Sequence, residues 1–184
     1  GVRHIMLGGR GNVKLTFTPG KIPRYQFSFM CRHGAITDAV LPATTLTAFI
    51  EALVVSKANT PTFTIHGASS PGESLTIDLG QKTEGRFLIG YEGIEITDRN
   101  ATGTAVVEAR PLATVNWFAI QKARTRDALQ FIHGTEAGNI VQVDAPAVQI
   151  GKVAQGNTQG ILNYSLPLVF CPVSGNDELT ITVK

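Results

Sequence analysis

The sequence predicts a mainly β domain, a β-sandwich or half-barrel with one α-helix. Every second residue from Leu162 to Phe170 is apolar, which is the period of a strand with one buried face. Short alternating runs of the same kind recur between residues 62 and 150, separated by Gly, Pro or Asn. Only one segment, between Pro111 and Arg126, breaks this rhythm with helical spacing.

The C-terminal strands are expected to form a hairpin. The alternation of Leu162–Phe170 resumes at Leu179–Val183, after the turn-forming run Ser174–Asp177. Three residues favour positions near the edge of a sheet, where strands carry charges or proline: Pro167, Glu178 and Lys184. The apolar side of this hairpin needs a partner sheet.

A second hairpin is expected near the N-terminus. Val13–Phe17 and Tyr25–Phe29 both alternate, on either side of a break at Pro19–Pro23. His4–Leu7 is expected as a separate preceding strand, with the glycines of Gly8–Gly11 as its turn. Further strands are expected at residues 63–65, 75–79, 87–89, 94–96, 104–108, 129–132, 141–143 and 148–150, which gives about ten short strands.

The single helix is expected between Pro111 and Arg126. Apolar side chains recur there at helical spacing, Thr114 is available as the N-cap, and basic residues gather near the C-terminal end. Because an apolar stripe usually packs on the core, three of its residues are expected to close the open side of the sheet: Val115, Ala119 and Ile120.

Residues 32–60 are expected to form a long connection, here called the arm. Connections of that length in a compact domain are either functional or disordered. Leu46–Val55 inside it is strongly apolar, and its periodicity does not decide between a short helix packed on its own subunit and an extended arm. Exposed, it would be too apolar to remain in water.

Composition indicates one soluble domain with a partly covered surface. The chain has 184 residues, enough for one sizeable core. Charged residues make up 16 %, below the roughly 25 % that is usual in soluble domains. The net charge is +2, and the basic residues are scattered along the chain, so composition does not indicate nucleic-acid binding. No membrane-spanning run or signal-peptide pattern is present, and because Gly1 is not methionine, a segment is expected to precede it.

No catalytic, metal or cofactor site is predicted. The four histidines lie far apart, no serine has a G-x-S-x-G context, and Cys31 and Cys171 are expected as free thiols. His66 and His133 each precede a glycine and are expected to face turns. Carboxylates on the polar strand faces leave a glycosidase-like pair as a weak alternative, since sequence cannot bring two of them together.

The ending Gly160–Lys184, with GNDEL followed by TITVK, resembles the C-terminus of tail tube (major tail) proteins of long-tailed bacteriophages. Other stretches resemble the same family and together cover nearly the whole chain from Arg10 onward: residues 59–67, 73–80, 92–103, 111–123 and 131–149. The resemblance implies a single tail-tube-like domain over residues 1–184, whose N-terminal part is incomplete, and a structural protein rather than an enzyme.

The resemblance further implies a virion protein that assembles in the host cytoplasm into stacked hexameric rings. Such rings would form a tube that meets other tail proteins at its ends and lets DNA pass without specific binding. Inter-ring contacts are expected from the arm residues Leu46, Phe49, Ile50, Leu53 and Val54. A polar, acidic lumen is expected from Glu92 and Glu95. The alternative is a β-sandwich carbohydrate-binding or adhesion module, which would need an exposed aromatic platform; Trp117 lies in the expected helix.

Overall fold

The computed structural model describes residues 1–184 and confirms a mainly β fold with one helix. The strands number twelve rather than about ten, and the first two are long. The elements in chain order are β1 (Val2–Phe17), β2 (Arg24–Asp38), β3 (Thr62–Ile65), β4 (Gly72–Asp78), β5 (Gln81–Leu88), β6 (Tyr91–Arg99), β7 (Thr102–Glu108), α1 (Trp117–Ala123), β8 (Arg126–His133), β9 (Val141–Ile150), β10 (Ala154–Thr158), β11 (Ile161–Phe170) and β12 (Thr180–Val183).

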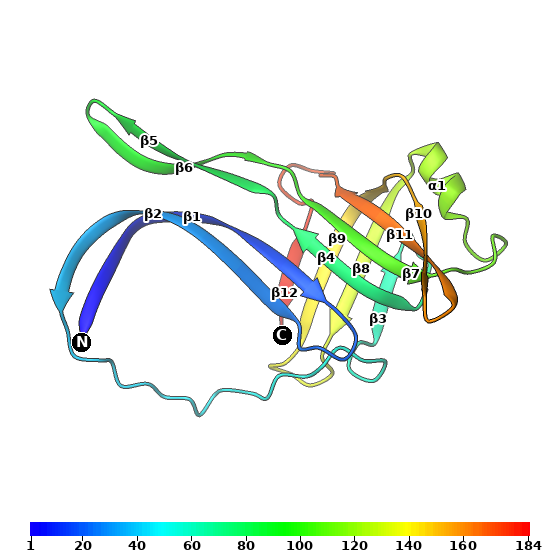
Figure 1. Ribbon diagram of the computed structural model, residues 1–184, viewed down its shortest axis with the longest axis horizontal. Helices are drawn as coiled ribbons and strands as arrows, with labels where there is room; N and C mark the ends of the chain where they lie inside the picture. Colours follow the sequence, from blue (N-terminus) through cyan, green and yellow to red (C-terminus); the bar gives the residue numbers. More distant parts are fainter.

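Ten strands form one curled sheet that makes up the body of the molecule. Its main order is β2-β1-β4-β7-β11-β9-β8-β3, with β10 added to β11 and β12 added to β9. The remaining strands, β5 and β6, pair only with each other. Figure 1 shows that the β1–β2 hairpin and the β5–β6 hairpin both leave the body on the same side, while α1 lies at the opposite end.

The inner face of the curled sheet holds the core, a cluster of 22 buried residues. Alternation explains it: in β7 and β11 every second side chain, including Ala105, Val107, Leu166 and Leu168, is almost fully buried. Trp117 from the helix adds the largest fully buried side chain. Close packing of such side chains supplies most of the stability of the body.

The expected pairing of the two C-terminal strands with each other is wrong. β12 pairs with β9, with Ile181 opposite Val143, and not with β11. β11 is also not an edge strand, because β7 flanks it on one side and β10 and β9 flank it on the other. Pro167 fits because it falls between the end of the β10 pairing at Ser165 and the start of the β9 pairing at Leu168. Glu178 is buried and forms a 2.5 Å ion pair with Arg99.

The expected turn at Gly8–Gly11 is absent, since β1 continues through it. The register of β1 against β2 shifts between Leu7 and Arg10, so Gly8 and Gly9 form an irregularity within one strand. Gly11 is needed for close approach, because a side chain there would collide with the backbone of Ser28 and the ring of Phe29. The glycines therefore bend a long hairpin instead of ending a short one.

The helix is shorter than expected and begins later. Residues 111–115 form a turn in which the Thr114 and Val115 N–H groups donate to the carbonyl of Pro111. The N-cap is Asn116, whose Oδ1 accepts the Ala119 N–H at 2.9 Å, and not Thr114. This later start changes which residues face the core: Trp117 is buried, Ile120 is half-buried, and Ala119 is exposed, contrary to expectation. Val115 is buried, but in the turn before the helix.

Candidate assembly surfaces

Two ribbons of paired strands extend beyond the core with unpaired edges. β1 pairs with β4 only over Lys14–Phe17, so its long N-terminal part has β2 as its only partner. The outer edge of β2 has no partner over its full length, and β5–β6 has two such edges. A two-stranded ribbon is marginally stable alone, and free edges accept strands of other chains. The ribbons are therefore the first candidate surfaces for assembly.

The base of the β5–β6 ribbon is fastened to β1 by a polar cluster. Asn12 Nδ2 donates to Asp78 Oδ1 at 2.7 Å, Asn12 Oδ1 accepts the Gln81 N–H at 3.1 Å, and Lys14 Nζ lies 3.1 Å from Asp78 Oδ2. Burial alone would raise the pKa of Asp78, but hydrogen bonds from Asn12, the Gly80 N–H and Lys14 hold that pKa below its usual value. The carboxylate of Asp78 thus joins the two ribbons.

The expected lumen residues Glu92 and Glu95 both lie on β6. Arg32 of β2 contacts Glu92, with Nη1 2.5 Å from its carbonyl oxygen and 3.6 Å from Oε2. Glu95 accepts a hydrogen bond from Tyr91, which raises the pKa of the Tyr91 hydroxyl. Glu84 of β5, which sequence reasoning missed, lies directly across from Glu95. Like charges in opposite positions destabilise a ribbon. Each carboxylate has a local partner here, because Lys82 Nζ lies 3.4 Å from Glu84 Oε1 and the Tyr91 hydroxyl donates to Glu95.

The arm begins later than expected, because β2 continues to Asp38. Residues 39–61 form the connection, and no helix lies within it. Figure 1 shows the chain drawn out from the open end of the β1–β2 hairpin, beside the N-terminus, back to the body. Phe49 is 85 % exposed, and Leu46, Ile50 and Val54 are also exposed, whereas Leu53 is half-buried. Apolar side chains in such numbers on an extended chain mark an interaction segment.

The C-terminal end of the arm is fixed to the body by buried groups. His133 Nε2 lies 3.2 Å from the Leu53 carbonyl oxygen, and its Nδ1 lies 3.1 Å from Thr60 Oγ1. Val55 is buried, its N–H donates to the Lys21 carbonyl, and its own carbonyl accepts the Gly20 N–H. His133 therefore points inward to hold the arm, contrary to the expectation of a turn-facing ring.

His66, the second histidine expected to face a turn, also bonds inward. Its Nε2 lies 2.7 Å from the Val148 carbonyl oxygen. Its backbone has a positive φ of 51°, and Gly67 follows it in the same left-handed region. Both histidines are thus structural groups of the body.

An exposed aromatic face on β2 is the surface that sequence reasoning missed. Tyr25, Phe27 and Phe29 stack along the strand with ring centroids 6.1 and 5.8 Å apart. Tyr25 lies opposite Leu15, and Phe27 lies opposite Val13. Since residues directly opposite share a sheet face, this aromatic face continues the core face beyond the body. Phe27 and Phe29 are nevertheless 62 % and 66 % exposed.

The structure assembles no group with evident chemistry. No cluster of three or more His, Cys, Asp or Glu side chains is placed to hold a metal ion. Both cysteines are free thiols, and no helix has the length and apolar character required to cross a membrane. The candidate surfaces are therefore the open edges, the arm and the aromatic face.

Free strand edges and exposed apolar segments on a well-packed β body define a structural subunit built to contact other chains. A family model described as phage tail tube protein matches residues 2–170, and the chain belongs to this family. It is therefore a structural component of the phage tail, and the family assembles with itself and with other tail proteins. A search of curated proteins finds no match.

Proposed function

We propose that the chain forms hexameric rings that stack into the tail tube and conduct DNA. One observation carries this proposal: the β1–β2 and β5–β6 ribbons leave the body on the same side with unpaired edges. Edges on two different ribbons can pair head to tail, from one subunit to the next, until a ring closes. Closure pairs ribbon edges of neighbouring subunits, as in a β-barrel, and surrounds a central channel. We expect six copies to close the ring.

The acidic positions of β5–β6 support a channel that DNA does not stick to. The aromatic face of the β1–β2 hairpin continues the core face and is apolar, so we do not assign it to the channel. We therefore place the channel on the side of β5–β6, with Glu84 and Glu95, which share one face of the ribbon, as lining residues. Glu92 lies on the other face, where Arg32 of β2 contacts it. Carboxylates repel phosphates and lower the affinity for DNA, so that it slides during ejection.

The arm supports stacking of one ring on the next. Its apolar residues from Leu46 to Ile50 are exposed in the single subunit, although its end at Leu53 is fixed to the body. Contact with the next ring would bury them. We further propose that assembly takes place in the host cytoplasm and that other tail proteins end the tube.

Electron microscopy of the purified protein tests the proposal. Hollow rings or tubes about 100 Å wide are expected, on the order of several domain diameters. The matched control replaces residues 83–97 by Asn-Gly, which shortens the β5–β6 ribbon to a tight turn and leaves the body intact. This variant should remain monomeric by sedimentation. Monomers alone from the full chain at high concentration, or tubes from the shortened variant, would contradict the proposal.

The aromatic face also gives the carbohydrate-binding alternative a specific test. Trp117 is buried and offers no platform. The stacked rings of Tyr25, Phe27 and Phe29 could in principle support a sugar, but they continue the core of the body and two of the three carry no hydrogen-bonding group. We expect no binding on a glycan array, and specific binding that Phe27→Ala abolishes would favour this alternative.

A further inference from the structure

We infer that the aromatic face of β2 is the seat for the arm of a second copy of this chain, with Phe49 of one subunit packed on Phe27 and Phe29 of another. This inference rests on the proposed function, because it names which two surfaces meet when subunits assemble. Both surfaces are apolar, both are exposed, and they lie on different parts of the chain.

The seat is built like a core surface that lacks its cover. Stacking fixes the three rings into a flat series, and Gly11 opposite Phe29 leaves room for that ring to lie over the β1 backbone. Met6 of β1 lies opposite His33, which follows Cys31 by two residues on the same face of β2, and Met6 is 72 % exposed. Burying such side chains stabilises a contact by roughly 25 cal/mol per Å² of apolar area.

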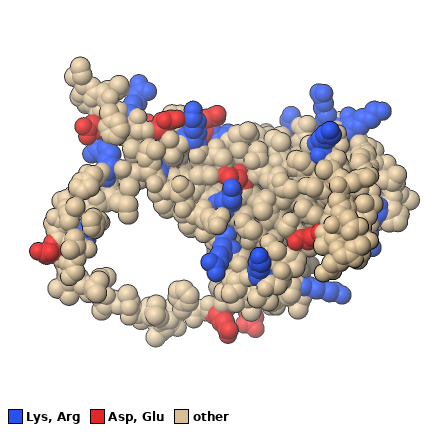
Figure 2. All heavy atoms as spheres, in the orientation of Figure 1, with Lys and Arg blue, Asp and Glu red and all other residues tan.

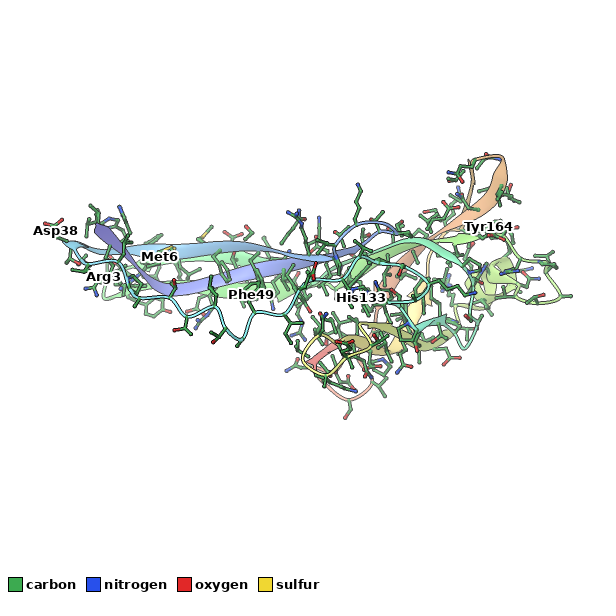
Figure 3. All side chains as sticks on the ribbon, turned by 90° about the horizontal axis from the view of Figure 1, so that it is seen from below. Arg3, Met6, Asp38, Phe49, His133 and Tyr164 are labelled. Carbon is green, nitrogen blue, oxygen red and sulfur yellow. The ribbon has the colours of Figure 1, made fainter.

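The arm of the same subunit does not occupy this seat. Its first residue is held at the open end of the hairpin, away from the β1–β2 turn, where the Ala39 N–H donates to the Gly1 carbonyl at 2.9 Å. Its other end is held at the body, where Asn139 Nδ2 donates to the Glu51 carbonyl at 3.1 Å. Figure 3 shows Phe49 between these ends, with Arg3 and Asp38 at the open end of the hairpin and His133 in the body. Figure 2 shows an opening bounded by the hairpin, the arm and the body.

The charges of the two surfaces are complementary, which points to an arm as the occupant. Residues 1–38, which include both strands of the hairpin, contain six Lys and Arg residues and one acidic residue, Asp38. Residues 39–56, which include the free part of the arm, contain Glu51 as their only charged residue. An apolar segment with one carboxylate and a basic ribbon with an apolar face attract each other.

The pairing of unlike surfaces also explains why the contact propagates. A seat and an arm on the same chain make a head-to-tail contact, in which each subunit gives one arm and receives another. Such a contact does not saturate in a dimer. It continues around a ring or from one ring to the next.

Photocrosslinking tests the inference directly. Phe49 is replaced by benzoylphenylalanine in chains mixed from ¹⁴N and ¹⁵N preparations, which are assembled, irradiated and digested with trypsin. The expected product joins the arm peptide of one isotope to the Tyr25–Arg32 peptide of the other. Crosslinks within one chain, or to another surface, from assembled tubes would overturn the inference while leaving the proposed function standing. Failure of the unmodified chain to form rings or tubes would overturn both.

A mutant cycle gives an independent test that does not need the probe. Phe27→Ala and Phe49→Ala should each raise the critical concentration for assembly about tenfold. Because they act on the same contact, the double variant should stay close to the single variants instead of reaching about a hundredfold. Leu112→Ala, an exposed residue near the helix, is the control and should leave assembly unchanged. Fully additive effects of the two Phe substitutions would contradict the inference.

Discussion

The body and the β1–β2 hairpin are built from strands with the same alternation but differ in what covers them. In β11, Leu166 and Leu168 are almost fully buried beneath other strands. In β2, Phe27 and Phe29 lie on a continuation of the same face and are more than half exposed. The body is therefore complete within one chain, whereas the hairpin is only half of an interface. Substitutions of the same kind should separate the two regions.

The largest effect is expected in the body. Leu166→Ala removes a side chain with no exposure, leaves a cavity in the core, and should lower the free energy of unfolding by about 3 kcal/mol. Urea denaturation of the monomer at low concentration measures this change. Leu162→Ala on the same strand, where the side chain is exposed, is the control and should lie within about 0.5 kcal/mol of wild type. Equal losses for both variants would contradict a core confined to the inner face.

The next largest effect is expected where the arm joins the body. His133→Ala leaves the Leu53 carbonyl and the Thr60 hydroxyl without their partner in a buried site, which should cost about 1–3 kcal/mol of stability. Hydrogen exchange of residues 53–60 should accelerate in the same variant. His33→Ala changes an exposed ring on β2 and should alter neither quantity. Unchanged exchange in His133→Ala would show that the arm is held by its other bonds, such as those of Val55 and Glu51.

Sequence reasoning found the faces of the strands better than their partners. Alternation in β11 and β12 indicates which side chains point inward, but it contains no information on which strand lies alongside. Alternation thus could not show that β12 pairs with β9 and not with β11, the strand that precedes it in the chain. Glycines were ambiguous for a similar reason, since Gly8 and Gly9 can end a strand or bend one, and only the pairing across to β2 decides.

The candidate surfaces could be predicted only in part. The apolar run around Leu46 and Phe49 suggested an arm because its position in a long connection offered no core to cover it. The run Tyr25–Phe29 gave no such signal, because an alternating strand reads the same whether its apolar face is covered or open. The apolar face of β2 is open because the strand extends beyond the body. That length depends on the pairing of β2 with β1, which the sequence of β2 alone does not show.

A smaller effect is expected at the joint between the two ribbons. The pKa of Asp78 is lowered in the folded state, so the ionised form stabilises the joint at neutral pH. That contribution is present above the unfolded pKa of about 3.9 and is lost as pH falls through the lower folded value. Asp78→Asn should cost less than about 1 kcal/mol at pH 7, and the difference from wild type should shrink below about pH 4. Denaturation curves across this pH range measure it, and a difference that grows in acid would contradict the assigned charge.

The smallest effect on the single chain is expected at the aromatic face, and it separates the two regions most sharply. Phe27→Ala removes a ring that is mostly exposed in the monomer, so the free energy of unfolding should change by no more than about 0.5 kcal/mol. Phe17→Ala removes a ring of the same size from the buried contact with Phe131 and should cost about 3–5 kcal/mol. Paired measurements of monomer unfolding and of tube formation should therefore give opposite rankings: Phe17→Ala weakens the fold, and Phe27→Ala weakens assembly while the fold is unchanged. If Phe27→Ala instead destabilises the monomer as strongly as Phe17→Ala, the ring is covered within its own chain and the aromatic face is not an open surface.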